Sequence, residues 1–309
     1  MPTTDVFKRV LLGRALRSDR ASEQELPKYL ALPIFASDPL SSVAYATQEI
    51  LVVLSLAGLA YYSFTPFAAI AVVFLLTVVV VSNRQLVKAY PSGGGNFEVT
   101  LRNLGGRPGM VVASALLIDY VLTVAVSVSA GVDNIISAFP GIENHRVSLA
   151  IGFVVFLSAM NLRGIKESGR LFAIPTYAFV VVVLFMVGLG LSKYFFTDGG
   201  LQAESAGLTL APEEGYGTLG TLGIVFLALR AFSSGCTALT GVEAIANGVP
   251  AFRAPKARNA ATTLTVMAVL AGSMFIGLTT LAVLANVRYA EDPVQQFVGF
   301  PADGVQRTV

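Results

Sequence analysis

The chain contains 309 residues, of which 54% are hydrophobic and only 13% are charged, and its formal net charge at pH 7 is +2. Its mean hydropathy of +0.71 and this low charged fraction exclude an ordinary soluble domain, in which about 25% of residues are charged. The lone cysteine, Cys236, cannot form an internal disulfide, and with one histidine it supplies too few ligands for a dedicated zinc site.

Long apolar stretches along the chain predict membrane-spanning helices. Each approaches or reaches the roughly 20 residues that cross about 30 Å of hydrocarbon as a helix. They do not alternate with the period of two that barrel strands show. The predicted spans are residues 28–58, 65–83, 109–136, 147–163, 171–192, 221–247 and 260–287.

The basic residues predict how these spans are oriented. Most of the 21 lysines and arginines lie in the N-terminal arm and in every second connection after it, whereas the long opposite connection, 193–220, is mildly acidic and rich in glycine. Because basic loops remain in the cytoplasm, we predict a multi-pass protein of the plasma membrane with a cytoplasmic N-terminus. The arm itself, residues 1–27, fits either an amphipathic surface helix or a solvated basic tail.

The first span contains Asp38 and Pro39 in the middle of an apolar segment. Proline has no N–H group and biases the preceding residue away from helical geometry, and Asp before Pro is typical of a helix start. We therefore predict that the helix breaks here, with Asp38 at the positive end of a second half-helix. Ser42 and Tyr45 follow on the same helical face. A carboxylate at membrane depth is costly and usually functional, although the alternative is that Asp38 only caps a kink.

The third span contains Asp119, Thr123 and Ser127 at positions i, i+4 and i+8, which places them on one stripe of a helix. Threonine and serine often bond back to their own helix. Together with Asp119, however, they predict a track of oxygen atoms that faces a partner or a water-filled cavity.

The sixth span contains Thr240 and Glu243 just after the small residues 233–235, where we predict a second break. Glu243 is either a ligand or proton carrier at mid-depth, or an interface residue that pairs with a basic loop. Arg230, before the break, balances a buried carboxylate, belongs to an outer gate, or extends to the interface. Glu49 and Asp133 are poorer candidates for a site because they lie near the outer ends of their spans.

Residues 35–39 of the first span resemble residues 232–236 of the sixth, since both segments place small polar residues and a helix breaker in mid-span. The two spans run in opposite directions, and broken helices in two opposed halves are typical of a transporter substrate site. The chain would then comprise one five-helix repeat and two helices of a second. The expected segments are a first repeat at 28–192, an extracellular loop at 193–220, the second-repeat helices at 221–287 and an extracellular tail, a truncated loop, at 288–309.

The chemistry of these side chains favours a cation as substrate. Carboxylates, hydroxyls and carbonyls around one cavity can replace the hydration shell of an ion. An amino acid would bring its own carboxylate, which Asp38 would repel. These residues therefore favour a metal cation, protons or an amine, and a buried carboxylate could also bind a proton near neutral pH.

Four segments of the chain resemble the KimA branch of potassium transporters, which is similar to the KUP potassium uptake family within the amino acid–polyamine–organocation (APC) superfamily. The resemblance extends from about residue 8 to residue 287. The segments that carry it are residues 37–45, 90–95, 117–127 and 232–245.

This resemblance implies an all-α integral membrane protein with the LeuT-type (APC) inverted-repeat fold, incomplete here, with about seven transmembrane helices of which helices 1 and 6 are broken. It implies proton-coupled potassium import, with K+ and H+ as transported ions and no cofactor. The implied potassium ligands are Asp38, Tyr45, Asp119, Thr123, Ser127, Thr240 and Glu243, and the implied proton-linked acids are Asp38, Asp119 and Glu243.

Members of this branch have about twelve spans, with a tyrosine ligand in a later helix, and some add a cytoplasmic C-terminal domain that forms a homodimer. We therefore expect this chain to be a fragment whose partners are the lipid bilayer and a small cation, and not nucleic acid. The main alternative is an APC-family amino acid or amine permease. An intramembrane aspartyl protease would need a Gly-x-Gly-Asp motif that the sequence lacks, so we do not expect an enzyme.

Overall fold

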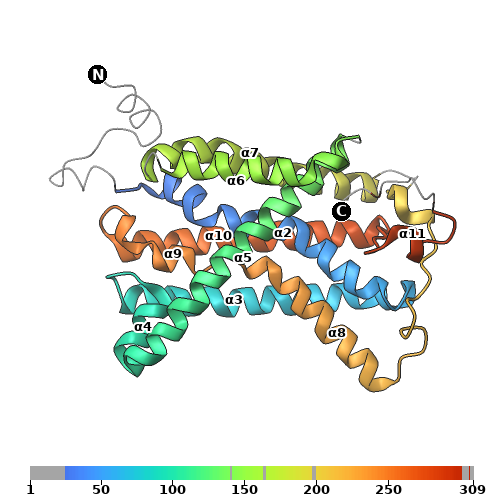
Figure 1. Ribbon diagram of the computed structural model, residues 1–309, viewed down its shortest axis with the longest axis horizontal. Coiled ribbons are helices and arrows are strands. Elements are labelled where there is room, and N and C mark those ends of the chain that lie inside the picture. The colour runs from blue at the N-terminus through green and yellow to red at the C-terminus, as the bar shows by residue number, and fades with distance from the viewer. Residues whose placement is uncertain (1–24, 140, 163–164, 197–199, 301–305, 307–309) are drawn as a thin grey trace.

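The computed structural model describes residues 25–139, 141–162, 165–196, 200–300 and 306. Within these ranges the chain is helical, and instead of strands it has only two isolated β-bridges. Most of the predicted N-terminal arm, 1–27, lies outside the described residues. The all-helical architecture predicted from the sequence is therefore confirmed for the described part of the chain (Figure 1).

Every predicted span corresponds to a helix. The long helices are α2 (Lys28–Ser55), α3 (Thr65–Ala89), α5 (Gly106–Ala138), α6 (Arg146–Asn161), α7 (Ile165–Phe196), α8 (Thr221–Gly235) and α10 (Lys256–Leu284). Shorter pieces connect them, namely α4 (Gly95–Leu104), α9 (Ala244–Asn247), α11 (Pro293–Gln296) and the 3₁₀ helices η2 (Leu59–Phe64), η3 (Glu143–His145), η4 (Glu204–Gly207), η5 (Cys236–Leu239) and η6 (Val249–Ala251).

Five segments of the described chain are long and apolar enough to cross a membrane. They are Leu59–Ala89, Gly106–Ala138, Gly169–Phe196, Thr221–Asn247 and Lys256–Leu284. Helix α6 has only 16 residues, and α2 interrupts its apolar sequence with polar and charged side chains. The number of seven spans therefore stays a prediction.

Helix α2 lies at the centre of the bundle and packs against α3, α7, α8 and α10. Its completely buried residues include Leu40 and Ser42, which point to opposite sides of the helix. Figure 1 shows α2 between the α6–α7 layer and the α3–α8 layer. A polar group on α2 therefore meets protein rather than lipid.

Helix α2 corrects the predicted break at Asp38, because it runs without interruption from Lys28 to Ser55 with two prolines inside it. A proline removes one helical hydrogen bond and kinks a helix, and neighbouring groups can satisfy the carbonyl that it frees. The Tyr177 hydroxyl of α7 donates a 2.9 Å hydrogen bond to the carbonyl of Tyr29, which Pro33 leaves without its usual donor. Packing against α7 thus compensates for that proline, and the prediction that helix 1 is broken was wrong.

Helices α5 and α6 form the exposed side of the bundle. Only Gly109, Val132 and Ile136 of α5 are buried, and α6 has no buried residue. Figure 1 shows α5 crossing the other helices diagonally. Its apolar side chains therefore face lipid or further protein, while a limited part of its surface meets α2.

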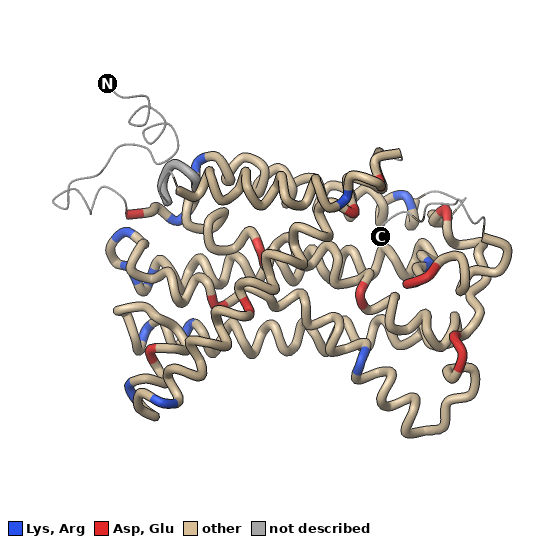
Figure 2. The backbone as a smooth tube through the Cα atoms, viewed as in Figure 1, with Lys and Arg blue, Asp and Glu red and all other residues tan. Residues whose placement is uncertain are grey.

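Most of the described lysines and arginines lie toward one end of the bundle, as Figure 2 shows, and this is the arrangement that the charge pattern predicts. A tight turn at this end leads into α4 and packs beneath α9. Gly95 has a φ of 50°, and a Cβ atom there would lie 2.0 Å from Asn247 Oδ1. The glycine is needed for this close approach.

The contact between α7 and α10 generates a prediction for stability. We expect Gly277→Ala to lower the melting temperature of the purified chain in detergent. The added Cβ would lie 2.6 Å from Cγ1 of Val187, and a β-branched neighbour has few other rotamers. Overpacking of this kind costs about 1–3 kcal/mol.

The matched control is Gly272→Ala on the same helix, where an added Cβ meets no neighbouring atom within 4 Å. Because alanine has the higher helix propensity by about 1 kcal/mol, this variant should melt at the same temperature as the wild type or above it. Equal melting temperatures for the two variants would contradict the close packing of α7 on α10.

Candidate functional site

The sixth span is broken, but the break follows the predicted residues 233–235, which belong to the helix, and it contains Thr240 and Glu243. Helix α8 ends at Gly235, η5 follows, and α9 begins only at Ala244. Between them, Gly241 has a φ of 75°, which an L residue rarely adopts. A Cβ atom at this position would lie 2.4 Å from Asp38 Oδ2 and 3.1 Å from Pro39 Cδ. The interruption therefore lets the backbone approach the acidic segment of α2.

A row of hydroxyl groups joins α2 to this break. Ser42 Oγ lies 2.8 Å from Tyr45 Oη and 2.8 Å from Thr240 Oγ1. Thr240 Oγ1 also donates to the carbonyl of Thr237 at 2.6 Å. Each hydroxyl has one hydrogen, so Ser42 donates to Thr240 and Tyr45 donates to Ser42. This order leaves the lone pairs of Tyr45 Oη available as acceptors.

Asp38 connects α2 to α5. Ser127 Oγ donates a 3.1 Å hydrogen bond to Asp38 Oδ1, whereas Asp38 Oδ2 is buried without a hydrogen-bond partner. A buried carboxylate oxygen without a donor is unfavourable by itself. Asp38 is therefore only half satisfied by the protein.

Glu243 is placed at the break, directly before α9. Its Oε1 is buried and has no hydrogen-bond partner, and its carboxylate interacts electrostatically with Asp119 and Asp38. No ion pair to a basic loop is formed by Glu243 among the residues that the structure describes. Glu243 therefore lies beside the other acids, and its role as a ligand or proton carrier stays a prediction.

The structure brings most of the predicted site residues together. Asp38 and Ser127 are bonded directly, and Tyr45 and Thr240 are bonded through Ser42. Asp119 lies close enough to Asp38 and Glu243 for its charge to repel theirs. Thr123 shares the stripe of Asp119 and Ser127 on α5, but within the described chain no hydrogen bond ties its side chain to α2 or to the break.

Three polar residues extend the site beyond the predicted set. Ser42 is completely buried between two predicted ligands, and its spacing four residues after Asp38 was the available signal. Asn247 donates a 2.5 Å hydrogen bond to the Tyr120 hydroxyl, and its Oδ1 is buried without a partner. The sequence contains no signal for Asn247 and Tyr120, because their contact depends on how α9 packs beside α5.

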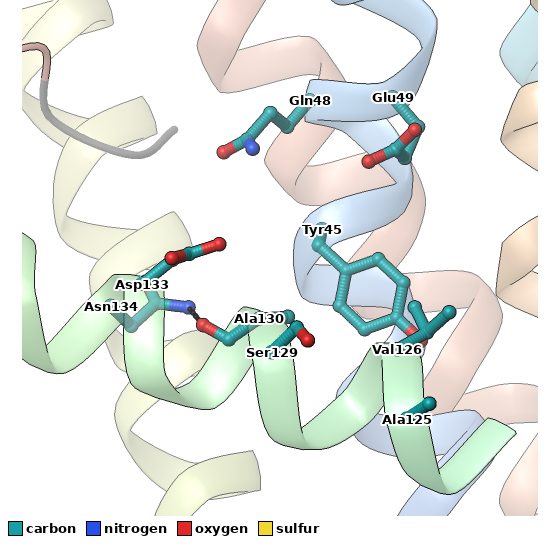
Figure 3. Close-up of a pocket in the computed structure, with 9 residues that line it drawn as sticks. All are labelled: Tyr45, Gln48, Glu49, Ala125, Val126, Ser129, Ala130, Asp133 and Asn134. Atoms are coloured by element: carbon teal, nitrogen blue, oxygen red, sulfur yellow. Dashed lines mark hydrogen bonds between the residues drawn. The ribbon is translucent and has the colours of Figure 1, made fainter. Parts of the chain in front are cut away.

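A cavity of about 300 Å³ lies between α2 and α5, and Tyr45 is one of the residues that line it (Figure 3). Glu49 and Asp133, which the sequence made poorer candidates, both line it. Glu49 accepts a 3.4 Å hydrogen bond from Ser234, and Asp133 pairs with Arg146 at 2.7 Å. The cavity leads to Tyr45 and so to the row of hydroxyls.

Two other polar groups, Tyr289 and Arg230, do not line this cavity. Tyr289, just beyond α10, interacts electrostatically with Asp133 and Glu49, and burial raises the pKa of its hydroxyl. Arg230 is exposed and donates a 2.9 Å hydrogen bond to the Tyr216 hydroxyl. Of the roles considered for Arg230, extension toward the interface fits this geometry, and balancing a buried carboxylate does not.

The predicted ligands around the break supply oxygen donors only. Among the described residues, no group of three or more His, Cys, Asp or Glu side chains is arranged to hold a metal ion. The oxygens around the break are instead a mixture of carboxylate and hydroxyl, with Asp38 Oδ2 and Glu243 Oε1 lacking donors. A weakly hydrated cation could supply the missing positive charge to such oxygens.

Comparison with known proteins places the chain in a family. The sequence pattern of the family described as "Amino acid permease" matches residues 31–290. The chain is 45% identical over 276 residues to "Potassium transporter KimA" of Bacillus subtilis (strain 168), a match that covers 89% of this chain and 44% of KimA. This similarity confirms the predicted resemblance to the KimA branch.

The chain is also 27% identical over 145 residues to "Low-affinity putrescine importer PlaP" of Escherichia coli (strain K12), which covers 47% of this chain and 29% of PlaP. These relatives are transporters, not enzymes. The chain spans less than half the length of KimA. Because the family pattern extends over most of its residues, the chain belongs to the amino acid permease family.

Proposed function

We propose that this chain is part of a secondary active transporter that imports potassium together with protons across the plasma membrane. The observation that carries the proposal is the pair of buried, donor-free carboxylate oxygens, Asp38 Oδ2 and Glu243 Oε1, beside a row of hydroxyls. A cation is the partner that such oxygens would favour.

The proposed potassium ligands are the predicted ones. Asp38, Tyr45 and Ser127 lie on the two helices that line the cavity, and Thr240 and Glu243 lie at the break. Asp119 and Thr123 extend the oxygen track along α5. Protons would be carried by one of the three acids, Asp38, Asp119 or Glu243, because neighbouring carboxylates that interact electrostatically resist being charged together.

We further propose the LeuT-type inverted-repeat arrangement, with residues 28–192 as the first repeat and 221–287 as the start of the second. Support comes from the opposed directions of α2 and α8 and from the broken backbone where they meet (Figure 1). The basic end would lie in the cytoplasm, and residues 193–220 and 288–309 would lie outside the cell.

An amine is the second candidate substrate, since PlaP is named as a putrescine importer. Putrescine is a cation without a carboxylate, so Asp38 would not repel it. KimA matches at higher identity over a much larger share of this chain, which favours potassium over an amine. An amino acid would place a carboxylate beside Asp38 and is the least compatible of the three.

The function can be measured as uptake of rubidium, a potassium tracer, into proteoliposomes with and without an inward proton gradient. The complete reading frame should be compared with this 309-residue chain. We expect gradient-driven uptake by the complete protein that potassium competes and that putrescine and amino acids do not. Uptake of putrescine without uptake of rubidium would show that the substrate is an amine and not potassium.

Loss of a carboxylate ligand gives the second prediction. Asp38→Asn and Asp119→Asn should each weaken cation binding roughly 10-fold or more, since an interaction with a charged group contributes about 1.5–3 kcal/mol. Binding can be measured by rubidium competition at equilibrium. The control is Glu49→Gln, whose carboxylate lines the outer cavity and should affect binding much less. A greater loss in the control than in Asp38→Asn would place the site elsewhere.

Glu243 provides a test of proton coupling. Glu243→Gln keeps the shape of the side chain but cannot exchange a proton, so potassium uptake should lose most of its dependence on the proton gradient. The measurement is rubidium uptake at fixed potassium and varied external pH, with Glu213→Gln in the outer loop as the control. Unchanged pH dependence in Glu243→Gln would assign the proton to Asp38 or Asp119.

A further inference from the structure

A second cavity lies far from the cation site, at the basic end of the bundle. It has a volume of about 530 Å³ and lies between the C-terminal part of α3 and the first turns of α10. Arg84 and Lys88 contribute from α3, and Arg258 contributes from α10. The other residues that line it are Pro255, Ala257, Ala261 and Thr262, and none of the lining residues is acidic.

Within the described ranges of the chain, the three cationic side chains around this cavity have no acidic partner. Among the described residues, none of them forms an ion pair, and Arg84 Nε is buried without a hydrogen-bond partner. The neighbouring Lys256 differs, because it pairs with Glu25 at 2.9 Å and bonds to the carbonyl of Pro250 at 2.8 Å. Like charges that converge without a partner repel one another, and a buried guanidinium nitrogen without an acceptor is costly.

The start of α10 adds further positive potential to the same cavity. This helix has 29 residues, begins after Pro255 without a side-chain cap, and has no acidic residue in its first turn. The first N–H groups of such a helix lack internal acceptors, and the helix dipole makes this end positive. An anion in the cavity would meet both these N–H groups and the three cationic side chains.

Exposed valines lead away from the cavity along both helices. On α3, Val81 precedes Arg84 by three residues, and on α10, Val269 follows Arg258 by eleven. These spacings place each valine on the same side of its helix as its arginine. Helices α3 and α10 pack together and run in opposite directions (Figure 1), so both valines lie from the cavity toward the apolar part of the bundle.

We propose that this cavity binds an anionic phospholipid through the phosphate group of its headgroup. Arginine is suited to bidentate binding of phosphate oxygens, and basic pockets between spanning helices are typical sites for acidic headgroups. The exposed Val81 and Val269 would then lie beside the acyl chains. This inference is independent of the transported ion, since it depends on neither Asp38 nor Glu243.

The test is thermal melting of the purified 309-residue chain in a neutral detergent, with one added compound at a time. The compounds are phosphatidylglycerol, phosphatidylcholine and inorganic phosphate. We expect phosphatidylglycerol to raise the melting temperature in a concentration-dependent manner and phosphatidylcholine to have little effect. Protection by inorganic phosphate to the same extent would retain the phosphate site but make a soluble anion its ligand. If neither phosphatidylglycerol nor inorganic phosphate raises the melting temperature, the proposal is overturned.

Variants identify the cavity. Arg258→Gln alters an exposed side chain and should weaken the phosphatidylglycerol response about 5-fold in half-maximal concentration, because one basic residue contributes roughly that factor toward an acidic lipid. Arg84→Gln should weaken it at least as much. The matched control, Arg107→Gln, removes an exposed charge outside the cavity and should behave like the wild type. An equal response in Arg258→Gln and Arg107→Gln would show only diffuse attraction and would refute the site.

Discussion

The structure depends on placing a carboxylate inside an apolar bundle with a hydrogen-bond donor for only one of its two oxygens. Asp38 lies on the most central helix, and the protein satisfies one of its two oxygens through Ser127. Placing a charge at this depth is expensive, so the surrounding elements are arranged around it. The backbone opens at Gly241 where it meets Asp38, and hydroxyls rather than apolar groups fill the space beside it.

Helix α2 and the segment that follows α8 contribute to the site in different ways. Helix α2 remains continuous and is therefore rigid enough to hold Asp38, Ser42 and Tyr45 in register along one face. The segment after α8 loses its helical hydrogen bonds and presents Thr240 and Glu243 from irregular backbone. Irregular backbone at membrane depth is tolerated only where protein or a cavity surrounds it, and α2 provides that protein surface. One rigid and one interrupted helix therefore build the site together.

The sequence predicted the helices well because their apolar stretches are long and their polar exceptions are few. It also predicted a break in the sixth span, but at residues 233–235, whereas the helix continues to Gly235 and the break follows it, with Gly241 at a positive φ. It was wrong about Asp38–Pro39, because proline weakens a helix only locally and the packing of α2 against four other helices maintains it. The bond from α2 to Ser127 and the contact of Asn247 with Tyr120 depend on how distant segments meet, which spacing along the chain cannot reveal.

The order of the hydroxyls has a consequence for how charge can move. Tyr45 donates to Ser42, Ser42 donates to Thr240, and Thr240 donates to the carbonyl of Thr237. A backbone carbonyl cannot take up a proton at physiological pH, so this chain of hydroxyls cannot pass a proton on at its Thr237 end. A proton that entered at Tyr45 would have nowhere to leave, and every hydroxyl would have to rotate before the next one could follow. The row therefore offers oxygen atoms to a cation but no exit to a proton, and under the proposed function a proton would use the carboxylates instead.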